Sequence, residues 1–128
     1  MNLKNHYAVV RPDLSATAVA VTPSIYEQLN QRFDDFKGHV LIAVHEFEND
    51  WDMWERHPAG DEVVVLMSGA ATLVLQTEAG EQRHELTESG SYVIVPKNSW
   101  HTAKVQVSTR MLFFTPGAGT EHRPLSDE

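Results

Sequence analysis

The residues of this sequence best suited to chemistry are two glutamates and two histidines, each heading a row of apolar side chains. Glu55 and His57 share one face of the predicted strand 51–57, because side chains two positions apart on a strand point to the same side. Glu62 and His101 each begin a later strand with an otherwise apolar face. A lone carboxylate or imidazole in such a row is costly unless it is paired, hydrogen-bonded or metal-bound. The pattern therefore predicts one shared partner, and a divalent metal is the simplest.

Composition restricts the ligands that such a metal can have. The chain of 128 residues contains no Cys, so thiolate ligands, a thiol nucleophile and disulfides are all excluded. Imidazole nitrogen, carboxylate oxygen and water remain, and this donor set suits iron, manganese, nickel or zinc. The candidate metal ligands are accordingly Glu55, His57, Glu62 and His101.

Charge and hydropathy limit the kinds of partner that the protein is expected to bind. The formal net charge is -8 and the basic residues do not cluster, so the basic patch of a nucleic-acid-binding protein is missing. No apolar run approaches the ~20 residues that span a bilayer, and the first residues lack the apolar segment of a secretion signal. We therefore expect a cytoplasmic protein that contacts neither nucleic acid nor membrane and binds a small neutral or weakly charged molecule.

The N-terminal part is expected to supply one strand and one helix. Residues 16–22 alternate in apolar character and predict a short strand. Over 23–37, apolar residues recur at helical spacing, with Thr22 as a possible cap and Gly38 as the stop. We expect one amphipathic helix there, and residues 1–38 packed on the rest of the domain as an extension.

From residue 39 onward the apolar pattern has a period of two, and turn-forming residues separate short segments. Eight strands are predicted, at 39–47, 51–57, 62–68, 71–77, 81–86, 91–96, 100–107 and 110–116. Strands this short and evenly spaced favour an antiparallel sandwich or barrel over a parallel sheet. The sequence thus predicts a single all-β domain with one short N-terminal helix, its barrel at 39–116 and a surface tail at 117–128.

Three further residues are candidates for a substrate pocket. Trp51 and Met53 share the strand face of Glu55 and would form an apolar wall for a ring-containing substrate, with plain core packing as the alternative. His45 lies in an alternating row and would either approach the same pocket or be a solvated or hydrogen-bonded histidine of its strand. Glu55 is also the candidate catalytic residue, because burial beside other carboxylates would raise its pKa and suit it to act as an acid or a base.

Two motifs in the chain resemble those of the cupin superfamily. The first, G-x5-H-x-H-x(3,4)-E-x6-G in the family, is matched here by Asn49, Glu55, His57, Glu62 and Gly69. The second, G-x5-P-x-G-x2-H-x3-N, is matched by Gly90, Pro96, Asn98, His101 and Val105. The offset to Gly69 selects Glu62 over its neighbour Asp61. The resemblance covers residues 49–105 and implies the four metal ligands already named.

Departures from the motifs matter most at position 55. Asn replaces Gly at 49 and 98, and Asn tolerates the left-handed backbone that a turn requires. Val105 replaces a terminal Asn, a change expected to affect local hydrogen bonding. Glu55 replaces the first His of the motif, which is a metal ligand in metal-binding cupins. The result is either a site of two His and two carboxylates or a site that has lost its metal.

The resemblance implies an antiparallel double-stranded β-helix, the RmlC-like jelly-roll barrel, that commonly forms a homodimer. It leaves the function open, because one fold carries many activities. Three alternatives remain. The chain is a metal-dependent enzyme of the oxygenase, isomerase or lyase type acting on a small organic molecule, a small-molecule-binding protein without turnover, or a metal-free epimerase or isomerase.

Overall fold

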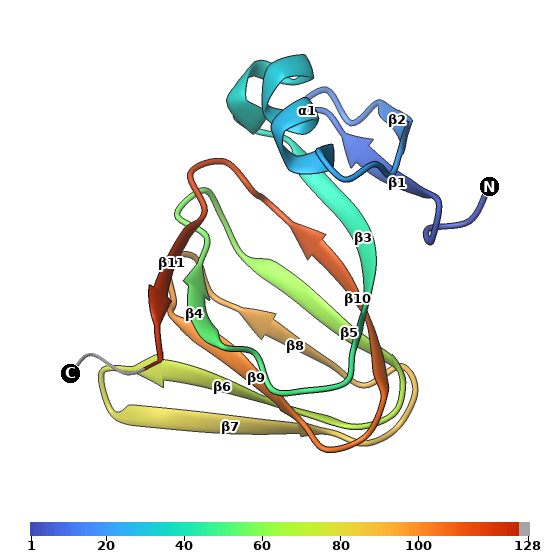
Figure 1. Cartoon of the computed structure of the whole chain (residues 1–128). Helices are drawn as coiled ribbons and strands as arrows, with labels where there is room; N and C mark the ends of the chain where they lie inside the picture. The colour runs from blue at the N-terminus through green and yellow to red at the C-terminus, as the bar shows by residue number, and fades with distance from the viewer. Residues whose placement is uncertain (126–128) are drawn as a thin grey trace.

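Two antiparallel β-sheets form the body of the protein (Figure 1). The computed structural model describes residues 1–125. In chain order the elements are β1 (His6–Val10), β2 (Ala16–Ala20), α1 (Ile25–Arg32), the 3-10 turn η1 (Asp34–Phe36), β3 (Val40–Phe47), β4 (Met53–Arg56), β5 (Glu62–Ser68), β6 (Ala71–Thr77), β7 (Gly80–Leu86), β8 (Tyr92–Val95), β9 (His101–Val105), β10 (Thr109–Thr115) and β11 (Glu121–Pro124). One sheet has the order β2-β1-β3-β10-β5-β8 and the other β11-β4-β9-β6-β7. The predicted all-β jelly roll with one short helix is confirmed.

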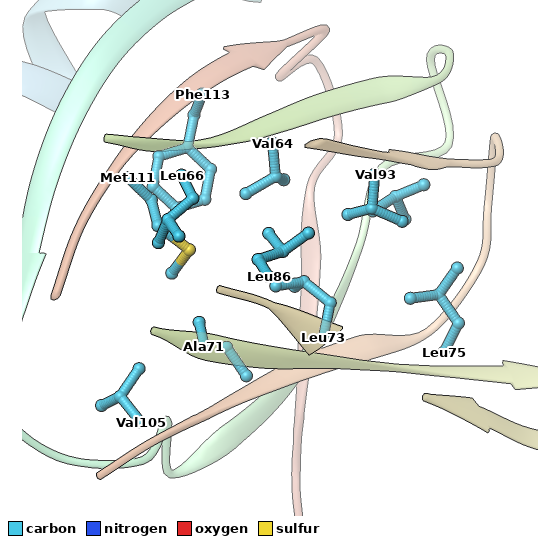
Figure 2. Close-up of a cluster of buried hydrophobic side chains, with 12 residues drawn as sticks. Val64, Leu66, Ala71, Leu73, Leu75, Leu86, Val93, Val105, Met111 and Phe113 are labelled. Carbon is cyan, nitrogen blue, oxygen red and sulfur yellow. The ribbon is translucent and has the colours of Figure 1, made fainter. Parts of the chain in front are cut away.

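The core lies between the two sheets and explains the period of two. Val64, Leu66 and Phe113 of the six-stranded sheet face Leu73 and Leu75 of the five-stranded sheet, as Figure 2 shows. All are buried, and the alternate positions along β5 are half-buried or exposed. Burying one such side chain stabilises a fold by roughly 1.5–3 kcal/mol. Alternation along the strands therefore fixes which side chains face inward.

The predicted helix at 23–37 is too long. The α-helix ends at Arg32, and Asp34, Asp35 and Phe36 then adopt left-handed backbone with φ of 53°, 52° and 62°. This turn buries Phe33 and Phe36 in a second apolar cluster with residues of β1, β2 and β3. Tertiary burial of these two rings thus outweighs continuation of the helix. No helix among residues 1–125 has the length and apolar character needed to cross a membrane.

Two strands are absent from the sequence prediction. The first, β1, pairs with both β2 and β3, and its residues Tyr7 and Val9 are buried. The second, β11, lies in the predicted surface tail, where it pairs with β4 at the edge of the five-stranded sheet (Figure 1). Its side chains are mostly exposed, so it shows no apolar alternation. The end of the predicted tail, residues 126–128, lies outside the described residues.

Side chains around Trp100 hold β11 in place. Arg56 of β4 and Arg123 of β11 each place their guanidinium carbon 4.6 Å from the centre of the Trp100 ring. Arg56 also donates a hydrogen bond to Glu121 of β11 at 2.9 Å. Cation–π contacts of this kind contribute about 0.5–1 kcal/mol each at exposed sites. The C-terminal segment is therefore fixed to the barrel beside Glu55.

Gly69 is required by the turn between β5 and β6. Its φ is +85°, and a Cβ there would lie 2.4 Å from the backbone oxygen of Ser108. Gly80, in the hairpin between β6 and β7, also has positive φ (+109°), but a Cβ there would meet nothing within 4 Å. An alanine at position 80 would therefore meet backbone strain alone, whereas an alanine at position 69 would meet both strain and steric overlap.

We expect Gly69→Ala to lower the free energy of unfolding by about 3 kcal/mol or more, because strain and overlap add. Gly80→Ala, the matched control, should cost only about 1–2 kcal/mol from strain alone. Urea unfolding followed by tryptophan fluorescence measures both. Equal costs for the two variants would show that the close approach of Ser108 does not constrain the turn.

Candidate metal centre

The barrel brings the four predicted ligands together from three strands. Glu55 on β4 is paired directly with His101 at the start of β9, His57 follows β4, and Glu62 begins β5. One ligand atom from each of the four lies within 4.8 Å of the others. His57 Nε2 is 3.0 Å from Glu55 Oε1 and 3.2 Å from Glu62 Oε2. His101 Nε2 is 3.2 Å from Glu62 Oε1.

Hydrogen bonds on the far side of each imidazole fix its orientation. His57 Nδ1 lies 2.8 Å from the hydroxyl oxygen of Thr120, and that hydroxyl donates its own hydrogen to the Gly117 carbonyl. His101 Nδ1 lies 3.1 Å from the carbonyl oxygen of Ser99, which can only accept. Both rings therefore carry their hydrogen on Nδ1. In the neutral form each directs the lone pair of Nε2 into the cluster, as metal-binding histidines do.

The converging atoms have unmet hydrogen-bonding capacity. His57 Nε2, His101 Nε2 and Glu62 Oε1 are buried, and none has a hydrogen-bond partner with suitable geometry among the described residues. Glu62 Oε2 does accept a hydrogen bond from Thr115 at 2.5 Å. Lone pairs that face one another in a dry interior repel, and a cation between them removes that cost. Two imidazole nitrogens and two carboxylate oxygens are a donor set that iron, manganese, nickel and zinc accept, so the residues fit a divalent metal.

The charged groups of the cluster shift one another's pKa values. Burial alone would lower the pKa of His57, but its contacts with Glu55 and Glu62 outweigh burial and raise that pKa to about 9. Burial alone would raise the pKa of Glu62, but its contacts with His101 and His57 lower it to about 2. In the metal-free protein the cluster therefore keeps its carboxylates charged by holding a proton on His57.

The expectation that burial raises the pKa of Glu55 is wrong in the metal-free protein. Burial does act in that direction, but the contact with His57 lowers the pKa of Glu55 below its usual value. The side chain is 25% exposed, and its second oxygen accepts a hydrogen bond from His122 Nε2 at 2.7 Å. Glu55 thus lies between the buried cluster and a histidine of β11.

A cavity of about 930 Å³ opens beside the cluster, and the three predicted pocket residues line it. The Trp51 ring lies 6.0 Å from the His101 ring, and Met53 is 37% exposed. His45 Nε2 is 3.1 Å from the hydroxyl of Tyr26, and burial lowers the pKa of His45. Contact of these side chains with a substrate stays a prediction.

Four residues near the cluster were not singled out from the sequence. Thr115 contacts Glu62, Thr120 orients His57, His122 holds Glu55, and Tyr26 contacts His45. Thr120 and His122 lie in the segment taken for a surface tail, and Tyr26 lies on the helix. No apolar alternation marks residues 121–124, so the sequence offers no periodic signal for this strand.

The exposure of Asp61 and the backbone conformation of Asn98 agree with what the motif offsets imply. Asp61 is exposed and accepts a hydrogen bond from the backbone of Lys97 at 2.7 Å, whereas Glu62 is 2% exposed and faces the cluster. Asn98 has a left-handed φ of 63°, as expected for a residue that replaces Gly. Asn49 is not among the residues with positive φ, so the corresponding expectation fails there.

Comparisons with known proteins give a fold and no sequence family. No family model matches the chain, and no curated protein matches it. Among solved structures, a cupin superfamily protein from Desulfitobacterium hafniense DCB-2 is 21% identical, with a TM-score of 0.50 over 59% of this chain and 65% of that one. The oxalate decarboxylase of Bacillus subtilis is 15% identical, with a TM-score of 0.54 over 67% of this chain and 23% of that one. An oxalate oxidase is 15% identical, with a TM-score of 0.53 over 63% of this chain and 44% of that one.

These likenesses show a shared fold at identities too low to carry over an activity. The chain matches less than two thirds of the length of each of the three proteins.

The metal-free protein should lose stability as His57 deprotonates. The pKa of His57 is about 9 in the folded protein, against 6.5 for a histidine in its ordinary, solvent-exposed state. The contribution of protonated His57 to the free energy of unfolding is therefore fully present below pH 6.5 and is lost as the pH rises through about 9. In chelator, we expect the difference in melting temperature between wild type and His57→Gln to shrink by roughly 5–10 °C between pH 6.5 and 9.5. A difference that stays constant over this range would contradict the raised pKa.

Proposed function

We propose that this chain, which has the fold of the cupin superfamily, binds one divalent metal through Glu55, His57, Glu62 and His101 and acts with it on a small organic molecule in the adjoining cavity. The chemistry proposed is that of an oxygenase, an isomerase or a lyase. The cavity of about 930 Å³ is large enough for a ligand of drug size.

One observation carries the proposal. His57 and His101 each have Nδ1 engaged by a protein acceptor, while their buried Nε2 atoms face only the carboxylates of the cluster and make no hydrogen bond of suitable geometry there. A cluster built only for packing would satisfy these atoms internally, because an unsatisfied buried polar group costs about 1–3 kcal/mol. The arrangement is what a metal site requires of its ligands.

The side chains of the cluster have separate tasks. A bound divalent ion would act as a Lewis acid toward an oxygen atom of the ligand. Glu62, His57 and His101 are buried and held by Thr115, Thr120 and Ser99, so they keep the donor geometry rigid.

Glu55 has a different task from the three buried residues. It is the partly exposed member of the cluster and lies beside the cavity. It can accept a proton from a ligand, and His122, which donates a hydrogen bond to its outer oxygen, orients it for that transfer. Trp51, next to His101, limits the access of water from the cavity side.

A metal-free acid–base site is the second candidate function. The specific observation in its favour is the proton that Glu55 and Glu62 hold on His57, which gives the cluster a charged acid beside two carboxylates. This candidate predicts activity and ligand binding that survive strong chelators, whereas the metal-dependent function loses both.

Metal content tests the main proposal. We expect plasma mass spectrometry to find about one iron, manganese, nickel or zinc ion per chain in protein purified without a His tag. The double variant His57→Ala, His101→Ala should contain none, because half of the donor set is removed. Asp61→Asn, which changes a carboxylate next to Glu62 but outside the cluster, should keep its metal. If the wild type contains no metal and takes up none of the four ions on reconstitution, the chain does not use a metal.

His122 should position Glu55 for metal binding. We expect His122→Ala to weaken metal affinity roughly 10-fold, since outer partners of metal ligands typically contribute 10–100-fold. His122→Gln keeps a hydrogen-bond donor and should retain most of the affinity. Competition with a fluorescent chelator measures both variants, and circular dichroism checks that β11 stays folded. Equal affinities of wild type and His122→Ala would show that Glu55 needs no second partner.

A further inference from the structure

The cavity contains more acidic groups than basic ones, and histidines are the basic residues among the described residues that line it. Its walls include five carboxylates, and among the described residues that line it there is neither a Lys nor an Arg; the carboxylates are Asp35, Asp50, Asp52, Glu55 and Glu62. The arginines closest in the fold to the cluster, Arg56 and Arg123, are engaged with Trp100 and carboxylate or amide partners outside the cavity. An anionic ligand would therefore find neither a Lys nor an Arg to bind along the described wall, and the one protonated imidazole there, His57, is already paired with Glu55 and Glu62.

The candidate metal does not supply the missing positive charge. Glu55 and Glu62 carry two negative charges, so a divalent ion bound by them and by two neutral imidazoles gives a centre with no net charge. A site with His at position 55 would instead keep one positive charge. This step rests on the proposed function. Without a metal, only protons offset the negative charges of Glu55 and Glu62, so the metal-free cavity is no more favourable to anions.

Aromatic side chains form much of the remaining wall. Phe47, Trp51 and Phe113 lie with ring centres 5.5–6.1 Å apart, and Tyr26 lines the same cavity beside His45. Such surfaces bind flat apolar groups, and their ring faces also attract cations. A cavity of about 930 Å³ is far larger than a ligand of six heavy atoms, such as oxalate, would fill.

We propose that the cavity takes an uncharged or cationic ligand that contains an aromatic ring, and discriminates against carboxylates. The two similar enzymes named above act on oxalate, as their names state. This chain shares their fold, but Glu55 and the other carboxylates of its cavity wall, where the described residues include no Lys or Arg, disfavour an anion such as oxalate.

Four probes test the charge preference on metal-loaded protein. Three share one ring and one chain length, namely 2-phenylethylamine, 2-phenylethanol and phenylacetate, and the fourth is oxalate. We expect calorimetric titration to show the amine and the alcohol binding at least about 10-fold more tightly than phenylacetate or oxalate, since one unit charge at such distances is worth a factor of this size. Phenylacetate or oxalate binding as tightly as the amine would overturn the proposal, as would failure of all four to bind.

Variants locate the source of the preference. Glu55→Gln keeps the shape of the side chain and adds one positive charge to the metal-loaded centre, so the ratio of amine to phenylacetate affinity should fall about 10-fold. Asp52→Asn leaves the metal ligands unchanged and should lower that ratio about 2-fold, as expected for a more exposed charge. Glu85→Gln, on an exposed position of β7 away from the cavity, is the matched control and should not change it. Trp51→Ala should weaken both aromatic ligands about 10-fold.

Metal content measured in the same samples separates the two proposals. Full metal loading without charge preference would overturn the ligand class and leave the metal site standing. Absence of metal would remove the proposed metal function, and the same titrations on that protein should still rank the amine and the alcohol above phenylacetate. The reverse ranking in metal-free protein would overturn the ligand class as well.

Discussion

Two carboxylates and two imidazoles can converge inside a β-barrel only if a metal ion or protons lie between them. The strands force this convergence, because Glu62 and His101 occupy inward positions whose neighbours along each strand form the core. Moving either side chain outward would shift its whole strand by one residue and expose that core. The apolar packing of the barrel therefore holds the polar cluster in place, and the cluster in turn needs positive charge, from protons or from a metal ion, between its carboxylates.

The C-terminal segment completes the site that the barrel strands begin. Thr120 fixes the hydrogen of His57 on Nδ1, and two residues later His122 contacts the outer oxygen of Glu55. Both contacts depend on β11 pairing with β4, which the side chains around Trp100 stabilise. A segment with an exposed surface thus determines the tautomer and the orientation of groups inside the barrel.

Glu55 sets the electrostatics of both the cluster and the cavity. As a carboxylate it cancels charge that a histidine at this position would leave on a divalent ion, and it adds to an acidic wall that contains Asp52. Its partial exposure, in contrast to the burial of Glu62 and His101, places it where a ligand in the cavity would contact it. One substitution in a motif thereby changes which ligands the same fold favours.

The sequence by itself determined most of the strands and the rows that face inward, because alternation is a local property, and the motif resemblance selected the four clustered residues. The motif offset to Gly69 chose Glu62, which is buried in the cluster, over Asp61, which is exposed. Only the tertiary structure decided the contacts of Thr120 and His122, the lowered pKa of Glu55 and the early end of the helix at Arg32. The helix end and the contacts of Thr120 and His122 depend on groups distant in the chain, and neither burial energy nor a hydrogen-bond partner across 60 or more residues leaves a periodic signal in the sequence. The lowered pKa of Glu55 depends on the distance to His57, which the fold sets.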